Sequence, residues 1–358
     1  MRIRRLEPIA VRLPLRRPVK MASEVVSAAE NVLVRLETAD GIVGWGEAAS
    51  APTMTGETVA TMVRAIAELA PLLSDTEDAH AVLQRLPGNH GAKAAIDIAL
   101  HDAIGKAAGK PVCELLGGVR RTSVPLLWTL AAGDVPGDIA EGQLMSAQGY
   151  RAFKIKVGIA DPATDAARTA AIRAELRRAD LVCADANQGW SRDDALRYVR
   201  GVEALGLAFV EQPVAAHDLA GMAELAAVSR VPIAFDEGVH SLDDIRRHHA
   251  AGCAGGSLKA IKLGGLRGIV AAAELCTSLG MRVNLACKIA ESGIAAAALL
   301  HAAATVPALE WAVSLTSHHL EDDLIATPLA IAHGHAEVPR GAGLGVEVRE
   351  SDLRRYRI

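Results

Sequence analysis

Residues 150–187 read YRAFKIKVGIADPATDAARTAAIRAELRRADLVCADAN. Two short apolar runs, 150–157 and 180–187, enclose an alanine-rich stretch with the spacing of an amphipathic helix. A strand, a helix and a second strand in this order predict a βαβ unit with parallel strands. Both runs end on polar side chains, which in such units lie together at the carboxyl edge of the sheet.

The same alternation continues along most of the chain after residue 122. Eight apolar runs recur at similar intervals: VPLLWTL (124–130), YRAFKIKV (150–157), DLVCADAN (180–187), LAFVEQPV (207–214), VPIAFDE (231–237), GSLKAIKL (256–263), MRVNLACK (281–288) and ALEWAVSL (308–315). Eight strands separated by helices are the number for a closed (β/α)₈-type barrel rather than an open sheet. The predicted fold class is therefore α/β.

The first third of the chain has a different pattern. Residues 32–36 and 42–47 form apolar strand patterns on either side of a turn at 39–41, which predicts an antiparallel meander. Residues 58–73 and 91–109 carry apolar side chains three and four positions apart, which predicts helices. We therefore expect a separate α+β unit in front of the barrel.

Composition and charge exclude several classes of function. The net charge of −4 leaves no basic surplus for binding nucleic acid, and no run of about 18 apolar residues would span a membrane. The basic start never reaches the apolar run of a signal peptide, and five cysteines without paired spacing predict buried thiols in a reducing compartment. We expect a cytoplasmic protein that binds neither nucleic acid nor membrane.

Charged and amide side chains follow most of the predicted barrel strands. They are Lys154, Lys156, Asp185, Asn187, Glu211, Asp236, Glu237, Lys259 and Glu291. Any one of the acidic residues alone would more simply be a helix N-cap or a solvated loop residue. From Lys156 to Lys259, however, they recur at intervals of one βα unit, so the strands should carry them to one rim of the barrel.

Three of these side chains are carboxylates that would face one another at the rim: Asp185, Glu211 and Asp236. Three like charges buried together are unfavourable without a cation. Oxygen ligands without His or Cys favour a hard ion, and a site with open positions for water and substrate suits Mg²⁺ better than Ca²⁺. The residues therefore predict a Mg²⁺ site, with Mn²⁺ as the second choice.

Lys154 and Lys156 are one residue apart in a strand, so both side chains should point to the same side. Alternating lysines usually mark an exposed face. Here the opposite face, from Phe153 to Val157, is apolar and would be covered by helices, so the lysine face must be the barrel interior. Two ammonium groups this close should lower each other's pKa and make one of them a usable base. Lys259 would approach from the strand nearly opposite.

At these residues the chain resembles the enolase superfamily, and within it the muconate lactonizing enzyme (muconate cycloisomerase) subgroup. The shared motifs run over nearly the whole chain: GWGEA (44–48), AKAAIDIALHDAIGK (92–106), ELLGG (114–118), FKIKVG (153–158), DANQGW (185–190), VEQP (210–213), FDEG (235–238), LKAIKLGG (258–265) and GLGVEV (343–348). The resemblance implies a (β/α)₇β modified TIM barrel over residues 123–325. It also implies an α+β capping domain over 1–122, to which a C-terminal segment over 326–358 returns.

The resemblance also implies roles for individual residues. Asp185, Glu211 and Asp236 match the metal ligands, Lys156 and Lys259 match the acid/base lysines, and Lys154 matches the residue that tunes Lys156. The pairing of Lys bases with Mg²⁺ is this superfamily's known arrangement. Lys262 is distinct from Lys259, because the family places the catalytic lysine five residues before the glycine pair. Asn187 and Glu237 would contact the substrate or support the ligands.

Two positions concern the substrate. Glu291 matches an acidic position after the seventh strand of several members, whereas Lys288 just before it is not a general family feature. Residues 18–24 (PVKMASE) and 53–58 (TMTGET) look most like those of muconate-type members. Lys20 and Lys288 could each bind an anionic group of a dicarboxylate. The alternative is that both lysines are merely solvated.

The expected activity is proton transfer at the carbon next to a carboxylate, through an enolate, in a small-molecule substrate. Cycloisomerisation of a muconate-like dicarboxylate is the first choice. Racemisation or epimerisation of an amino-acid derivative, and dehydration of the acid-sugar or o-succinylbenzoate synthase type, are alternatives. The Asp-x-Asp with which dipeptide epimerases hold the substrate ammonium has no counterpart here, and a catalytically inactive binding barrel would not need the complete site. The family also suggests a homo-oligomer.

Overall fold

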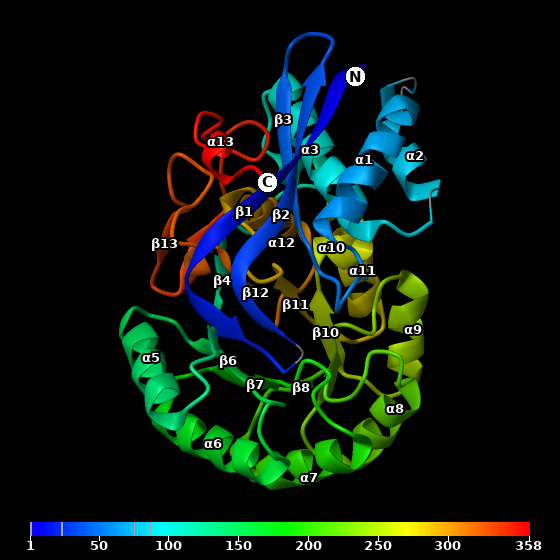
Figure 1. Ribbon diagram of the computed structural model, residues 1–358. Helices are drawn as coiled ribbons and strands as arrows, with labels where there is room; N and C mark the ends of the chain where they lie inside the picture. Colours follow the sequence, from blue (N-terminus) through cyan, green and yellow to red (C-terminus); the bar gives the residue numbers. More distant parts are fainter. Residues whose placement is uncertain (1, 23, 75, 77, 86) are drawn as a thin grey trace.

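The structure is a computed structural model that describes residues 2–358 apart from residues 23, 75, 77 and 86. Ser23, within the stretch 18–24 considered above, therefore lies outside the described residues. The chain forms a barrel, with a layer made of a long antiparallel sheet and its helices at one end of it (Figure 1).

The barrel is one eight-stranded parallel sheet. Its strands are β5 (Leu127–Leu130), β6 (Ala152–Lys156), β7 (Leu181–Asp185), β8 (Val210–Glu211), β9 (Ile233–Phe235), β10 (Gly255–Leu258), β11 (Arg282–Ala286) and β12 (Val313–Ser314). A parallel bridge between Leu126 and Val313 brings the first and last strands together. The eight predicted apolar runs are thus the barrel strands, and the predicted (β/α)₇β fold class is confirmed.

Helices cover the outside of the barrel. They are α5 (Val135–Ala147), α6 (Pro162–Glu175), α7 (Arg192–Val202), α8 (Leu219–Val228), α9 (Leu242–Ala250), α10 (Ala260–Leu263), α11 (Leu266–Ser278) and α12 (Gly293–Thr305). The sequence starts several of them with a capping side chain: Asp161, Ser191 and Ser241 each accept a hydrogen bond from a backbone N–H group in the first turn. Each of these three caps fixes the residue at which the loop ends and the helix begins.

The floor of the barrel is apolar. Cys183, Phe209 and Trp311 belong to one buried cluster inside the barrel, and the rings of Phe209 and Trp311 stack with centroids 4.0 Å apart. Large side chains fill the amino-terminal end of a small barrel, as is usual for this architecture. The charged side chains are therefore left to the carboxyl end.

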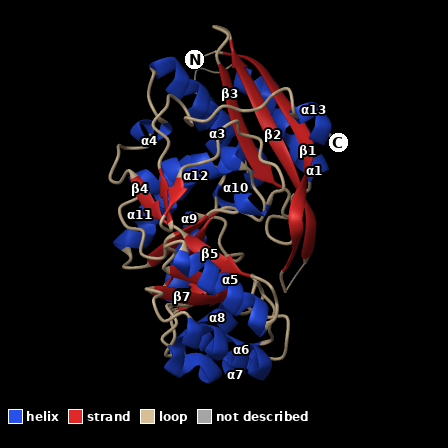
Figure 2. Ribbon diagram, turned by 90° about the vertical axis from the view of Figure 1, so that its left-hand side faces the viewer, coloured by secondary structure: helices blue, strands red, loops and turns tan. Residues whose placement is uncertain are grey.

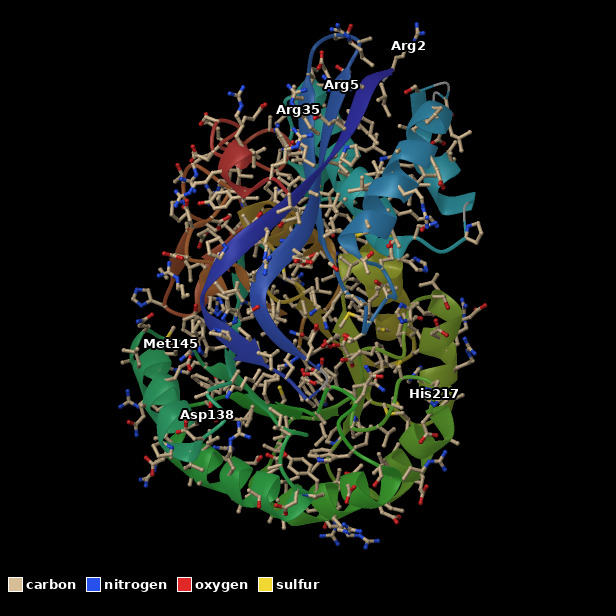
Figure 3. All side chains as sticks on the ribbon, in the orientation of Figure 1. Arg2, Arg5, Arg35, Asp138, Met145 and His217 are labelled. Carbon is tan, nitrogen blue, oxygen red and sulfur yellow. The ribbon has the colours of Figure 1, made fainter. Side chains whose placement is uncertain are left out.

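The capping layer is the predicted meander with helices behind it. Strands β1 (Ile3–Lys20), β2 (Val25–Thr38) and β3 (Val43–Ala49) pair antiparallel in this order, and α1 (Val59–Ser74), α2 (Ala79–Arg85), α3 (His90–Ala108) and α4 (Val112–Leu115) follow. Figure 2 shows the sheet as an upright layer at the upper right, above the barrel strands β5 and β7, and α3 packs against it. Arg2, Arg5 and Arg35 lie at the end of this sheet that is remote from the barrel (Figure 3).

The C-terminal segment runs back along both parts of the molecule. Strands β13 (Ile331–Ala332) and β14 (His335–Glu337) form a small sheet with β4 (Ser123–Pro125). Further on, the Leu344 N–H donates to Asp102 of α3, and Ile358, just after α13 (Leu353–Tyr356), bonds to Ala10 of β1.

Two predictions from composition can be compared with the fold. All five cysteines are free and buried, as predicted. Within the described part of the chain, no helix combines the length and the apolar character needed to cross a membrane.

Candidate active site

Three neighbouring strands bring the predicted carboxylates together at the carboxyl end of the barrel. Asp185 ends β7 and pairs in register with Glu211, which ends β8, while Asp236 directly follows β9. All three residues are at most 2% exposed. The spacing in the sequence therefore translates into a row of buried carboxylates, as predicted.

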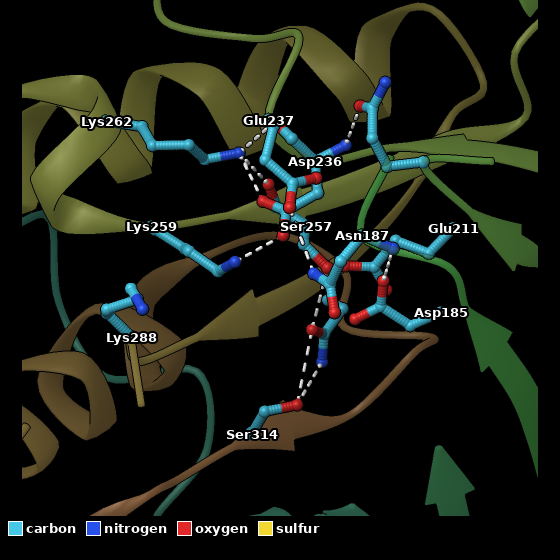
Figure 4. Close-up of polar contacts among 12 residues, drawn as sticks. Asp185, Asn187, Glu211, Asp236, Glu237, Ser257, Lys259, Lys262, Lys288 and Ser314 are labelled. Carbon is cyan, nitrogen blue, oxygen red and sulfur yellow. Dashed lines mark hydrogen bonds and ion pairs between the residues drawn. The ribbon is translucent and has the colours of Figure 1, made fainter. Parts of the chain in front are cut away.

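Lys154 and Lys156 of β6 contact this row, and so does Lys259, which directly follows β10. The Lys156 ammonium lies 2.6 Å from Asp185 Oδ2 and 2.6 Å from Asn187 Oδ1. The Lys154 ammonium lies 2.5 Å from Glu211 Oε2. Figure 4 shows Lys259 donating to Asp236 within the same cluster. β6 and β10 are four strands apart in the eight-stranded sheet, so the two lysines reach the carboxylates from different sides.

The expectation that neighbouring ammonium groups lower each other's pKa is wrong for Lys154. Burial alone would lower its pKa, but the carboxylates of Glu211 and Asp185 outweigh burial and raise it above the usual value. The pKa of Lys259 is likewise raised, because Asp236 outweighs the loss of water. Carboxylates at hydrogen-bonding distance dominate over the second lysine.

The carboxylates fall into two groups. Burial opposes ionisation of Asp185 and Asp236, yet their lysine neighbours lower the pKa of each, so both are anionic. Burial and nearby negative charge raise the pKa of Glu211, and they raise the pKa of Glu237 to about 7. Glu237 accepts a hydrogen bond of 3.0 Å from the Asn187 amide. Glu211 and Glu237 are thus the rim carboxylates whose negative charge the neighbouring lysines compensate least.

The residues present fit a divalent cation. Glu211 Oε1 and Glu237 Oε2 are buried, and neither has a hydrogen-bond partner among the described residues. A buried carboxylate oxygen without a donor is costly, and a cation would remove that cost. Asp185, Glu211 and Asp236 supply only oxygen ligands, which suits a hard ion of the Mg²⁺ type.

A cavity of about 50 Å³ lies above the carboxylates. The predicted residues that line it are Lys154, Lys156, Asp185, Asn187, Glu237, Lys259 and Lys288. Met21, Glu24 and Met54 of the cap line its other side. The cavity is therefore enclosed between the strand ends and the two cap loops that follow β1 and β3.

Four predicted residues do not line this cavity. Glu211 and Asp236 lie behind its lining residues Lys154 and Lys259, which they contact. Lys20 is exposed at the end of β1 and does not line the cavity.

Glu291 is buried, but it faces the backbone: its carboxylate accepts hydrogen bonds from the N–H groups of Lys288, at 2.9 Å, and Ala49, at 3.4 Å. Burial, followed by the nearby Glu47 carboxylate, raises the pKa of Glu291 to about 7.

Two further residues were missed from the sequence. Gln212 accepts hydrogen bonds from the N–H groups of Asp236, at 2.9 Å, and Gly238, at 3.1 Å, and so holds the loop that carries Asp236. Its position directly after Glu211 was the available signal. Glu24 binds Lys288, and nothing in the sequence indicates a contact between residues 264 positions apart.

A second group of potential metal ligands lies away from the cavity, in the cap. His80, Asp97 and His101 have ligand atoms within 4.8 Å of one another. His101 Nδ1 lies 2.8 Å from the Asp97 carbonyl oxygen, which can only accept, so Nδ1 carries the proton. The Asp97 carboxylate is 3.0 Å from His80 Nδ1 and accepts the Leu266 N–H at the start of α11. These contacts are those of a helix-capping network.

Comparisons with known proteins agree with this architecture. Residues 5–117 match the family described as mandelate racemase/muconate lactonizing enzyme, N-terminal domain, and residues 139–352 match the enolase C-terminal domain-like family. A barrel with a row of carboxylates and lysines at its carboxyl end, closed by such a cap, is an enolase-superfamily architecture. The chain belongs to the mandelate racemase/muconate lactonizing enzyme family of this superfamily, a family of enzymes.

Individual relatives cover nearly the whole chain. A chloromuconate cycloisomerase of Pseudomonas putida is 32% identical, and the match covers 99% of each chain. The crystal structure of a muconate lactonizing enzyme from Pseudomonas fluorescens complexed with muconolactone is 35% identical with a TM-score of 0.95, covering 100% of this chain and 99% of that one. An N-succinyl Arg/Lys racemase from Bacillus cereus ATCC 14579 is 28% identical with a TM-score of 0.93, covering 100% and 98%.

Proposed function

We propose that this chain is a divalent-metal-dependent cycloisomerase that acts on a muconate-like dicarboxylate. The observation that carries the proposal is the placement of Lys156 and Lys259 in one cavity with the row of carboxylates between their strands. Relatives named for muconate and chloromuconate cycloisomerisation support this choice of reaction.

Asp185, Glu211 and Asp236 would hold the metal, with Mg²⁺ as the first choice and Mn²⁺ as the second. When bound, the ion supplies positive charge where negative charge develops on the substrate carboxylate. Gln212 supports this arrangement from below, because its side chain fixes the loop that carries Asp236. Lys154 neutralises Glu211 and holds it in place.

The lysines supply the proton chemistry. Cycloisomerisation is an internal addition: an oxygen of one carboxylate bonds to a carbon of the diene, and a proton is added at the carbon next to the other carboxylate. We assign this proton to the Lys156 ammonium, which Asp185 and Asn187 orient at 2.6 Å each. Lys259 then stabilises the developing enolate from the other side.

Racemisation of an amino-acid derivative is the second candidate. Both lysines line the cavity, so each could handle a proton on its own face of the substrate. The structural likeness to a racemase of N-succinyl amino acids favours this candidate over dehydration. The two reactions differ in whether one lysine or both are essential.

The deciding measurement is exchange of the proton next to the carboxylate with solvent in heavy water, in the presence of Mg²⁺. For a cycloisomerase, Lys156→Met should lose proton incorporation by at least about 100-fold, the range typical of general acid catalysis, while Lys259→Met retains slow incorporation. For a racemase, either substitution should abolish turnover. Exchange at the wild-type rate in both variants would refute the assignment of the lysines.

The metal site has its own test. Mg²⁺ affinity should fall in each of Asp185→Asn, Glu211→Gln and Asp236→Asn, because each removes one anionic ligand. Calorimetric titration of the wild type and the three variants measures this. The metal site would have to be abandoned if all three variants bound Mg²⁺ as the wild type does.

A further inference from the structure

An ion pair joins the cap to the barrel at the edge of the cavity. Lys288, which follows β11, places its ammonium 2.8 Å from Glu24 Oε1, which precedes β2. The Lys288 side chain is 6% exposed and that of Glu24 is 25% exposed. Thr53 of the other cap loop also reaches Glu24, at 3.4 Å. Glu24 thus ties both cap loops to one lysine of the barrel.

This ion pair forms part of a wall between two spaces. The inner cavity of about 50 Å³ and an outer groove of about 210 Å³ share three lining residues, Glu24, Lys288 and Ile289. Ligand sites usually measure about 300–1,000 Å³. A substrate with two carboxylates therefore needs more room than the inner cavity offers, and separating Glu24 from Lys288 would join the two spaces.

Glu24 is the more exposed of the two partners, and besides Lys288 its carboxylate accepts a longer hydrogen bond of 3.4 Å from Thr53. The backbone of Lys288 is held from two directions, because its N–H donates to Glu291 at 2.9 Å and its carbonyl accepts from Thr316 Oγ1 at 2.7 Å. When Glu24 leaves, a nearly buried ammonium loses its counter-charge, which is unfavourable unless another anion replaces it. Binding is therefore favoured for a substrate that carries a second negative group.

We propose that Lys288 is the specificity-determining residue of this site: the second anionic group of the substrate takes the place of Glu24, so that only dianionic substrates are bound in the opened site. The inference rests on the proposed function for the position of the first carboxylate. The inference goes beyond the proposed function in two ways: Lys288 binds the second carboxylate of the substrate, and Glu24 excludes monoanions.

The probes are cis,cis-muconate and its monomethyl ester, which have similar shapes and differ by one charge. With Mg²⁺ present, the wild type should favour the dianion by about 30-fold or more in kcat/KM, the range for a buried charge pair that loses one partner. Lys288→Met should remove this preference, and Lys288→Arg should restore part of it. Glu24→Gln should lower KM for the dianion, because the competing carboxylate is gone.

The control is Lys110→Met, which removes an exposed cap lysine that lies 3.7 Å from Glu114 and should leave the preference unchanged. The proposal is overturned if Lys288→Met keeps the wild-type preference, or if kcat/KM of this variant falls equally for both probes. An unchanged KM for the dianion in Glu24→Gln would overturn the proposal that the substrate replaces Glu24 as the partner of Lys288.

Binding of a saturated dianion separates this inference from the proposed function. Adipate and its monomethyl ester should raise the melting temperature of the Mg²⁺-loaded protein to different extents in the wild type and equally in Lys288→Met. If muconate is not turned over but this contrast is found, the proposed reaction fails and the role of Lys288 stands. If muconate is turned over without any contrast, the role of Lys288 fails.

Discussion

Asp236 lies between two lysines that play different parts. Lys262 is fully buried and lies 2.7 Å from Asp236 Oδ1 and 3.0 Å from the Ser257 carbonyl oxygen. Lys259 also binds Asp236, but it lines the cavity. Because Lys262 is fully buried and does not line the cavity, we infer that it positions Asp236, whereas Lys259 faces the cavity.

This difference predicts opposite effects of two like substitutions. Lys262→Met should lower the free energy of unfolding by about 3 kcal/mol, since it removes the buried donor of the Asp236 carboxylate and of the Asp236 and Ser257 carbonyl groups. Lys259→Met should cost less stability, and it should slow turnover while leaving slow proton incorporation. Urea unfolding and steady-state kinetics of the same two proteins measure both quantities. A Lys259→Met variant with full activity beside an inactive, stable Lys262→Met variant would show that the register of β10 is wrong.

Local patterning explains which site residues could be predicted. Lys156, Asp185 and Lys259 each end or follow a strand whose apolar pattern is strong, and parallel strands necessarily bring such positions to one rim. The pairing of Glu24 with Lys288 could not be predicted, because it depends on how far a cap loop reaches across the barrel. The same uncertainty made Lys20 look like a candidate, although the structure leaves it exposed outside the cavity.

At the scale of elements, the packing of β3 against α3 depends on two glycines. A Cβ at Gly46 would lie 1.9 Å from the Ala95 carbonyl oxygen, and one at Gly44 would lie 2.2 Å from that of Ala99. The motif GWGE therefore lets a strand approach the backbone of a helix closely. From the sequence it could be assigned to a strand, but the need for glycine appears only when α3 is placed behind the sheet.

Gly46→Ala should therefore destabilise the cap by about 1–3 kcal/mol, because the clash is with backbone and β3 must move away from α3. Thermal unfolding followed by circular dichroism measures the loss. Ala107→Ser, on the exposed end of α3, is the matched control and should cost no more than about 0.5 kcal/mol. Equal stabilities of the two variants would mean that the close approach of β3 and α3 is not as described.

At the scale of the whole molecule, one buried carboxylate couples the cap to the barrel. Glu47 of β3 accepts hydrogen bonds from the Ser292 and Ala295 N–H groups at the start of α12, at 2.9 and 3.1 Å. It also accepts from Ser292 Oγ at 2.5 Å and from the Asn31 amide at 2.7 Å. The cap strand thus supplies the N-terminal partner of a barrel helix, and α12 lies directly after the loop that carries Lys288.

Glu47→Gln should weaken this coupling without changing the volume of the side chain. Backbone N–H groups face both carboxylate oxygens of Glu47, so the glutamine NH₂ opposes an N–H donor in either orientation, and the free energy of unfolding should fall by about 2 kcal/mol. Amide hydrogen exchange should quicken together in β3 and in the first turn of α12, while α6 and α7 keep wild-type protection.

Glu30→Gln, on the exposed face of β2, is the control and should change neither quantity. A double-mutant cycle with Ser292→Ala should give a coupling energy of about 1 kcal/mol, because both substitutions break the same hydrogen bond. Additive effects, or faster exchange confined to β3, would show that the cap and the barrel do not share this carboxylate as one cooperative unit.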